Sequence, residues 1–221
     1  MKILAIDTAT ERCSVALLID GRLFERGETV ARGHAELILP MIDAVLTEAG
    51  SEAAALDVLA FGRGPGAFTG VRIAAGVVQG LALGTDVPVA PVSNLEALAL
   101  GSAAIGERVL VAIDARMGEV YWAAYERTAA DRLATLSGER VDPPEAVVVP
   151  ADIHIGAGTG FKAYPALAAR CAAGRVDPEA LPEARSIALL GAAALARGEA
   201  QPAEYAVPVY LRDQVVRPPA R

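Results

Sequence analysis

The chain has 221 residues and a formal net charge of −7, with a pI near 4.9. This acidic balance argues against autonomous binding to nucleic acid, because neutralisation of phosphates by lysine and arginine supplies most non-specific affinity. The longest apolar stretches, such as 87–92 and 109–113, have the length of strands, so we expect no membrane span. The N-terminus does not resemble a secretory signal, and Cys13 and Cys171 have no paired spacing. We therefore expect a cytoplasmic protein without a disulfide framework or a zinc ribbon.

The first hundred residues predict a β-hairpin followed by helices that alternate with strands, which implies a mixed sheet covered by helices. The hairpin turns on Asp20-Gly21, a strong two-residue turn signal between apolar runs. Apolar residues at helical spacing predict a helix over 35–49 that Gly50 ends, and capping-box spacing at Ser93 begins another helix. The predicted strands are 2–7, 13–19, 22–26, 57–62 and 87–92, and a further helix is predicted at about 70–84.

The pattern restarts after residue 104, with strands at 108–114 and 119–127. The pair Ile113-Asp114 echoes Ile6-Asp7. We therefore expect a duplicated fold with halves at 1–104 and 105–221, and a C-terminal helix that can pack back on the first half. The later predicted elements are a short strand ending at Ala157, a helix through Cys171, a helix over 186–197 and an extended tail from Pro208 onward to Pro219.

A glycine-rich turn, Gly64 to Arg72, leads from a strand into the helix at about 70–84. Gly64 and Gly66 allow positive φ, and Thr69 is placed to cap the helix. That geometry suits anion binding and equally suits a tightly packed turn. No Gly-Lys-Ser/Thr ends the run, so it is not a P-loop.

Four segments together closely resemble the TsaB family, formerly called YeaZ. They are Ile6–Thr10, Gly64–Arg72, Ile113–Tyr121 and Pro208–Arg212. The resemblance spans nearly the whole chain and implies an α/β actin-like ATPase fold (ASKHA, ribonuclease H-like), with two duplicated halves that each hold a mixed sheet flanked by helices. It also implies a role in making N6-threonylcarbamoyladenosine (t6A) in tRNA.

The resemblance implies a non-catalytic scaffold that binds and activates a catalytic paralogue, TsaD. The ATPase TsaE and tRNA would be reached only through that complex, and a homodimer is expected when TsaD is absent. In TsaD two histidines four residues apart hold a metal, and the resemblance places Asn94 and Leu98 at those positions here. Leucine cannot ligate a metal, so we expect neither a metal site nor catalytic residues in this chain, and a metallopeptidase is disfavoured.

The resemblance implies that Asp7, Thr8, Asp114 and Gly158 occupy places where the actin-like fold contacts nucleotide. The alternative interpretation is that Asp7 only caps turn N–H groups, that Arg116 pairs with Asp114, and that the glycines around Gly158 form only a turn. We expect no cofactor to be required by this subunit, with ATP or ADP contacted within the complex. The runner-up function is a stand-alone ATPase or phosphotransferase in which Asp7 and Asp114 organise magnesium and phosphate.

Three glycines, Gly76, Gly80 and Gly84, form a nearly bare stripe on the helix at about 70–84. Glycine costs about 1 kcal/mol relative to alanine in a helix interior, so the stripe needs a reason such as close approach of another backbone. Packing within the chain and pairing with a partner helix both remain open. We expect a partner surface on this stripe and on the apolar side of the 35–49 helix, at Leu37, Met41 and Val45.

Overall fold

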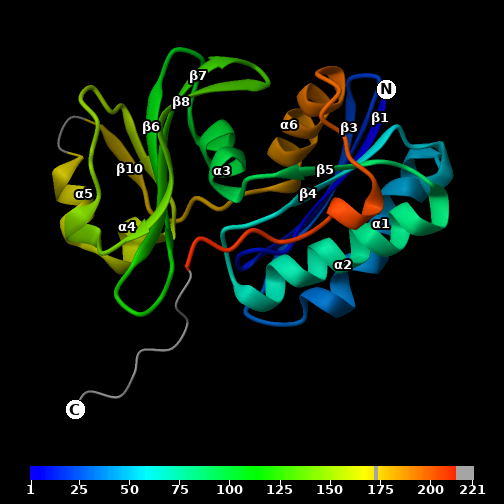
Figure 1. Cartoon of the computed structure of the whole chain (residues 1–221), viewed down its shortest axis with the longest axis horizontal. Coiled ribbons are helices and arrows are strands. Elements are labelled where there is room, and N and C mark those ends of the chain that lie inside the picture. Colours follow the sequence, from blue (N-terminus) through cyan, green and yellow to red (C-terminus); the bar gives the residue numbers. More distant parts are fainter. Residues whose placement is uncertain (172–173, 213–221) are drawn as a thin grey trace.

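The computed structural model describes residues 1–171 and 174–212, which form two lobes, each built on a five-stranded sheet (Figure 1). The strand order is β3-β2-β1-β4-β5 in the first sheet and β8-β7-β6-β9-β10 in the second. In both sheets the first three strands are antiparallel neighbours, and the next two continue the sheet in parallel. The repeated order confirms the predicted duplicated α/β fold.

The elements of the first lobe come from both ends of the chain. They are β1 (Lys2–Asp7), β2 (Arg12–Ile19), β3 (Arg22–Thr29), α1 (His34–Ala49), the turn η1 (Ala53–Ala55), β4 (Val58–Gly62), α2 (Phe68–Thr85), β5 (Val89–Val92), α6 (Ala184–Ala196) and the turn η3 (Ala203–Tyr205). The others are α3 (Asn94–Ser102), β6 (Arg108–Asp114), β7 (Val120–Ala129), β8 (Arg132–Asp142), the turn η2 (Pro144–Ala146), β9 (Ile155–Ala157), α4 (Thr159–Ala163), α5 (Pro165–Arg170) and β10 (Arg175–Asp177).

Strands β1, β2 and β4 of the first sheet are buried on both faces because helices cover each side, whereas the edge strand β3 is mostly exposed. Along β1, Leu4 and Ile6 face α1 and α2, whereas Ile3 and Ala5 face α6. This alternation is the period of two that a strand imposes. The C-terminal helix α6 therefore belongs to the first lobe, so the chain crosses into the second lobe and returns.

The second sheet is covered by α3 on one face and by α4 and α5 on the other. Helix α3 also contacts α6, so these two helices lie between the sheets (Figure 1). Ser93 begins α3 as predicted, since its hydroxyl accepts hydrogen bonds from the N–H groups of Leu95 and Glu96.

Several local predictions differ from the structure. Helix α2 begins at Phe68, so Thr69 lies inside it and Ala67 is the N-cap, without a side-chain cap. The helix predicted through Cys171 is two helices, α4 and α5, because Pro165 cannot donate the hydrogen bond that would continue the first. Strands β8 and β10 are present although the sequence pattern does not predict them. The tail predicted beyond residue 212 lies outside the described residues.

Helix α2 has 18 residues and a mean hydropathy of 1.2, and within the described chain it is the one helix long and apolar enough, by length and composition, to cross a membrane. In the sequence, α2 is not marked by a continuous apolar stretch, because glycines and Arg72 interrupt it. A helix that packs on the core of a protein can have the same length and apolar composition, and α2 packs along one side against β4. Length and composition are therefore weak evidence that α2 spans a membrane.

Candidate functional site

The turn that follows β1 is buried. Asp7 and Thr8 have no exposed surface. Oδ1 of Asp7 accepts hydrogen bonds from the N–H of Ala9 (3.0 Å) and from Nδ2 of Asn94 (2.8 Å), while Oγ1 of Thr8 donates to the carbonyl of Gly70 (2.7 Å). Oδ2 of Asp7 has no hydrogen-bond partner among the described residues. The interpretation that Asp7 caps an N–H of its own turn is confirmed.

The glycine-rich turn packs directly on the turn after β1. A Cβ at Gly70 would overlap the carbonyl oxygen of Thr8, and a Cβ at Gly66 would overlap that of Ala9. Backbone can approach backbone this closely only where one side lacks a side chain. The tightly packed turn is therefore the arrangement that the structure shows.

Asn94 and Leu98 both serve the packing of α3. Asn94 is fully buried and its Oδ1 accepts a hydrogen bond from the N–H of Gly64 (2.8 Å). Leu98 is 1% exposed and belongs to the apolar cluster between α3 and the second sheet. Among the described residues, no three His, Cys, Asp or Glu side chains group as metal ligands would.

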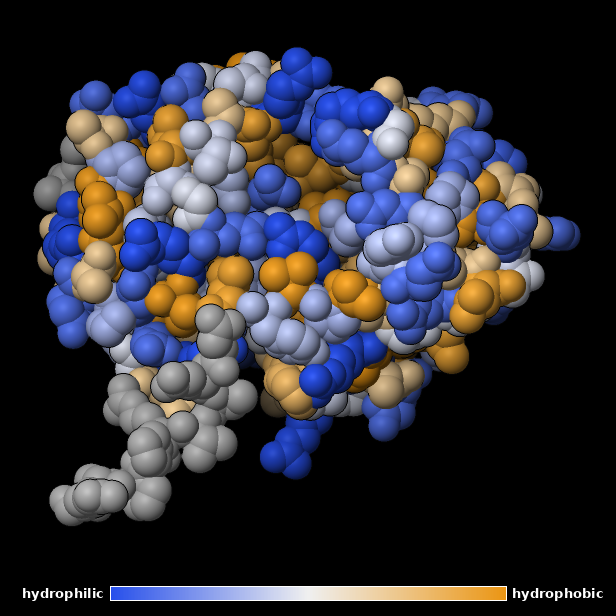
Figure 2. Space-filling model, in the orientation of Figure 1, coloured by the Kyte–Doolittle hydropathy of each residue, from blue (hydrophilic) through white to orange (hydrophobic). Residues whose placement is uncertain are grey.

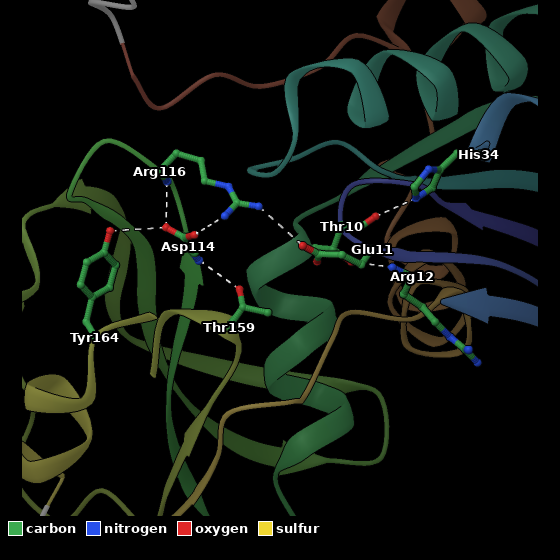
Figure 3. Close-up of polar contacts among 8 residues, drawn as sticks. All are labelled: Thr10, Glu11, Arg12, His34, Asp114, Arg116, Thr159 and Tyr164. Atoms are coloured by element: carbon green, nitrogen blue, oxygen red, sulfur yellow. Dashed lines mark hydrogen bonds and ion pairs between the residues drawn. The ribbon is translucent and has the colours of Figure 1, made fainter. Parts of the chain in front are cut away.

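The turn after β6 holds the second aspartate (Figure 3). Asp114 accepts hydrogen bonds from the N–H of Arg116 (2.9 Å) and, more distantly, from the hydroxyl of Tyr164 (3.5 Å), and it forms an ion pair with the Arg116 guanidinium (3.0 Å). The N–H of Asp114 donates to Oγ1 of Thr159 (3.1 Å). The predicted pairing of Arg116 with Asp114 is present.

Gly158 lies beside this turn, directly before Thr159. Its φ is +116°, and a Cβ there would overlap the carbonyl oxygen of Ala112 and lie 2.9 Å from Leu98. Close packing on β6 and α3 accounts for glycine at this position. The structure thus brings Gly158 and Asp114 together in the second lobe.

Two arginines join the lobes by ion pairs. Arg116 reaches Glu11 at 3.8 Å, and Arg63 pairs with Glu139 of β8 at 2.8 Å (Figure 3 shows the first pair). The turns that hold Asp7 and Asp114 are therefore connected through Glu11 and Arg116. Contact with nucleotide at Asp7, Thr8, Asp114 and Gly158 stays a prediction.

The predicted glycine stripe is open to solvent. Gly76, Gly80 and Gly84 are exposed, and a Cβ at any of them would meet no atom of the described residues within 4 Å. Packing within the described chain therefore does not explain these glycines.

The apolar side of α1 faces the core rather than a partner. Val45 is fully buried, so its prediction as an interface residue is wrong, and Leu37 and Met41 are partly buried against the same core. The exposed large apolar side chains on these two helices are Leu39 on α1, at 56%, and Phe68 and Leu83 on α2, at 57% and 77%. In the sequence, Leu39 lies outside the set of apolar residues at helical spacing on α1. This position was the signal that could have identified Leu39 as exposed. Figure 2 shows separate apolar spots, rather than one continuous patch, where α2 runs in Figure 1.

Comparison with known proteins identifies the relatives of this chain. The family model described as "TsaD: tRNA N6-adenosine threonylcarbamoyltransferase" matches residues 27–219. The chain is 43% identical to the "tRNA threonylcarbamoyladenosine biosynthesis protein TsaB" of Escherichia coli, over 97% of this chain and 96% of that protein. The chain belongs to the TsaB family. The solved structure "YeaZ from Pseudomonas aeruginosa" is 46% identical and covers 95% of this chain and 99% of its own, with a TM-score of 0.84.

In this TsaB-family chain, burial raises the pKa of Asp7 to about 7. Hydrogen bonds from Ala9 and Asn94 favour the ionised form and offset part of that effect. The Asp7 carboxyl therefore carries a proton for a large part of the time near neutral pH.

Asp7→Asn is expected to flatten the pH dependence of stability. The pKa of Asp7 is about 7 in the folded chain against 3.8 for the unperturbed group, so its contribution to stability is fully present below pH 3.8 and is lost as the pH rises through 7. By proton linkage, the unfolding free energy of the wild type should fall by about 2.5 kcal/mol more than that of Asp7→Asn between roughly pH 5 and pH 8. Urea unfolding across this range measures the difference. Asp43→Asn, on the exposed side of α1, is the control, and parallel profiles for all three proteins would contradict the prediction.

Proposed function

We propose that this TsaB-family chain is a non-catalytic subunit of the machinery that makes t6A in tRNA, acting in the cytoplasm. It binds and activates a TsaD-type subunit for threonylcarbamoyl transfer. It meets a TsaE-type ATPase and tRNA only within that complex, and it pairs with a second copy of itself when the TsaD-type subunit is absent. Its relatives are named as tRNA threonylcarbamoyladenosine biosynthesis proteins, which supports a role in t6A synthesis.

The observation that supports the non-catalytic role is that Asn94 and Leu98 make structural contacts within the chain. The hydrogen bonds of Asn94 join α3 to both buried turns, and Leu98 fills the core of the second lobe. Neither side chain is available to a metal or a substrate. The open stripe at Gly76, Gly80 and Gly84 supports a partner surface on α2, because a second backbone can approach there without displacing a side chain.

Reconstitution tests the proposal. The chain is purified with the TsaD-type subunit of the same organism, and threonylcarbamoyl transfer to unmodified tRNA is measured with and without it. We expect a stable complex and transfer that requires both subunits. ATP turnover by the isolated chain that Asp7→Asn abolishes would instead indicate the stand-alone ATPase.

The purified chain alone is expected to hold no stoichiometric transition metal and to transfer no threonylcarbamoyl group. The reason is that Asn94 and Leu98 supply no ligand pair. Elemental analysis after chelation measures the metal. Retention of zinc or iron at one equivalent per chain would contradict the expectation.

The isolated chain is also expected to bind tRNA weakly, because a net charge of −7 provides little counterion release. The dissociation constant should be weaker than about 1 μM at physiological salt, the range of non-specific binding. Filter retention over a salt series checks this. Sub-micromolar affinity would show that the chain contacts tRNA by itself.

A further inference from the structure

The last described segment of the chain crosses from one lobe to the other. We call residues 208–212 the strap. It leaves the first lobe after η3 and runs toward the β6–β7 turn, and it is the red segment between the lobes in Figure 1. At its start the N–H of Val209 donates to the carbonyl of Arg63 (2.7 Å), and the Val209 carbonyl lies 2.7 Å from where a Cβ on Gly64 would stand. The strap therefore lies directly on the glycine-rich turn.

The far end of the strap is fixed to the second lobe by Arg212. Its Nε donates to Oε2 of Glu119 (3.0 Å), and its Nη2 donates to the carbonyl of Ala115 (3.1 Å). The side chains of Arg212 and Glu119 are only 15% and 27% exposed. Removal of one partner of such a pair leaves the other charge poorly solvated, so this anchor should hold more strongly than a surface pair.

Between these ends, the ring of Tyr210 packs at a tilt of 37° against Phe68 at the start of α2. Its ring centroid lies 5.8 Å from that of Phe68, and the guanidinium carbon of Arg72 lies 3.4 Å from the Phe68 centroid and 5.3 Å from the Tyr210 centroid. We call Phe68, Arg72 and Tyr210 the aromatic cluster. Phe68 is 57% and Tyr210 47% exposed, so the cluster presents two aromatic rings to solvent.

The aromatic cluster continues the glycine stripe. Phe68, Arg72 and Gly76 succeed one another at four-residue steps, so with Gly80 and Gly84 they form one exposed row that winds gradually around α2. Arg72 forms no ion pair with another of the described residues, which leaves its charge free for a carboxylate. Exposed tyrosine and arginine are the residue types that most often dominate binding energy at protein interfaces.

We propose that the strap completes the partner surface of α2. The aromatic cluster is the anchoring end of that surface, and the TsaD-type subunit covers it with an apolar contact and a carboxylate facing Arg72. The anchor at Glu119 in the second lobe holds Tyr210 in place, so partner affinity depends on a residue outside the contact. This inference rests on the proposed function.

Binding of full-length variants to the TsaD-type subunit by titration calorimetry tests the inference. Tyr210→Ala and Arg212→Gln should each weaken binding by about tenfold or more, whereas Tyr210→Phe, which keeps the ring, should bind as the wild type does. Arg197→Gln removes an exposed ion pair with Glu199 at the end of α6 and is the matched control, with no loss expected. Circular dichroism shows whether each variant is folded.

The outcomes separate the two proposals. If the wild type binds and folded Tyr210→Ala binds equally well, the strap inference is overturned while the proposed function stands. If the wild type itself does not bind the TsaD-type subunit, both are overturned. Because the Tyr210 ring is half exposed, its removal leaves the core intact, and this variant decides the question even where Arg212→Gln fails to fold.

Discussion

Gly80→Leu is expected to leave the chain folded and to weaken its pairing with the TsaD-type subunit by about 100-fold. A Cβ at Gly80 meets none of the atoms in the described part of the chain within 4 Å, and leucine is the better helix former by up to about 1 kcal/mol, so the chain alone should not lose stability. At a close contact between helices, the same side chain overlaps the partner and costs several kcal/mol, or about 100-fold in affinity. Titration calorimetry gives the affinity, and circular dichroism gives the fold.

Gly138→Leu in β8 is the matched control for this experiment. A Cβ at Gly138 would also meet no atom of the described residues within 4 Å, and this glycine lies in β8 of the second lobe. We expect the variant to bind the partner as the wild type does. Undiminished affinity of folded Gly80→Leu would place the interface elsewhere, and an equal loss in both variants would show that the effect is not specific to α2.

Gly70→Ala is expected to destabilise the chain by about 3 kcal/mol or more, because the added methyl group would overlap the backbone of Thr8. Gly76→Ala lies in the same helix with open space around it, and it should stabilise by about 0.5–1 kcal/mol through helix propensity. Urea unfolding of the two variants measures the contrast. Equal stability of Gly70→Ala and the wild type would refute the close contact between the two turns.

The elements that could be predicted carry signals within a few residues. Asp20 and Gly21 both adopt positive φ in the hairpin turn, Gly50 ends α1 in the left-handed conformation, and the hydroxyl of Ser93 caps α3. Strand β8 lacks such a signal because its side chains are exposed or only partly buried, so no apolar alternation marks it. It is a strand because it pairs with β7 along its length.

The candidate site was predicted less well because burial depends on distant parts of the chain. Val45 lies in the apolar stripe of α1, and the spacing alone does not show whether this stripe meets a partner or the chain's own sheet. The structure shows that the stripe meets the sheet. The sequence likewise offers no means of separating Gly70, which is packed on Thr8, from Gly76, which is open.

The sequence by itself determined the order of the elements, the duplication and the family, because hydrophobic period, turn residues and caps act locally and the family segments are contiguous. Only the tertiary structure decided that Asp7 is buried, that Asn94 joins two turns and that the strap crosses between the lobes. Each of these rests on contacts between residues far apart in the chain: Asp7 with Asn94, Thr8 with Gly70, and Arg212 with Glu119. The pairing of such distant groups is set by how the two sheets and their helices pack, which no local pattern encodes.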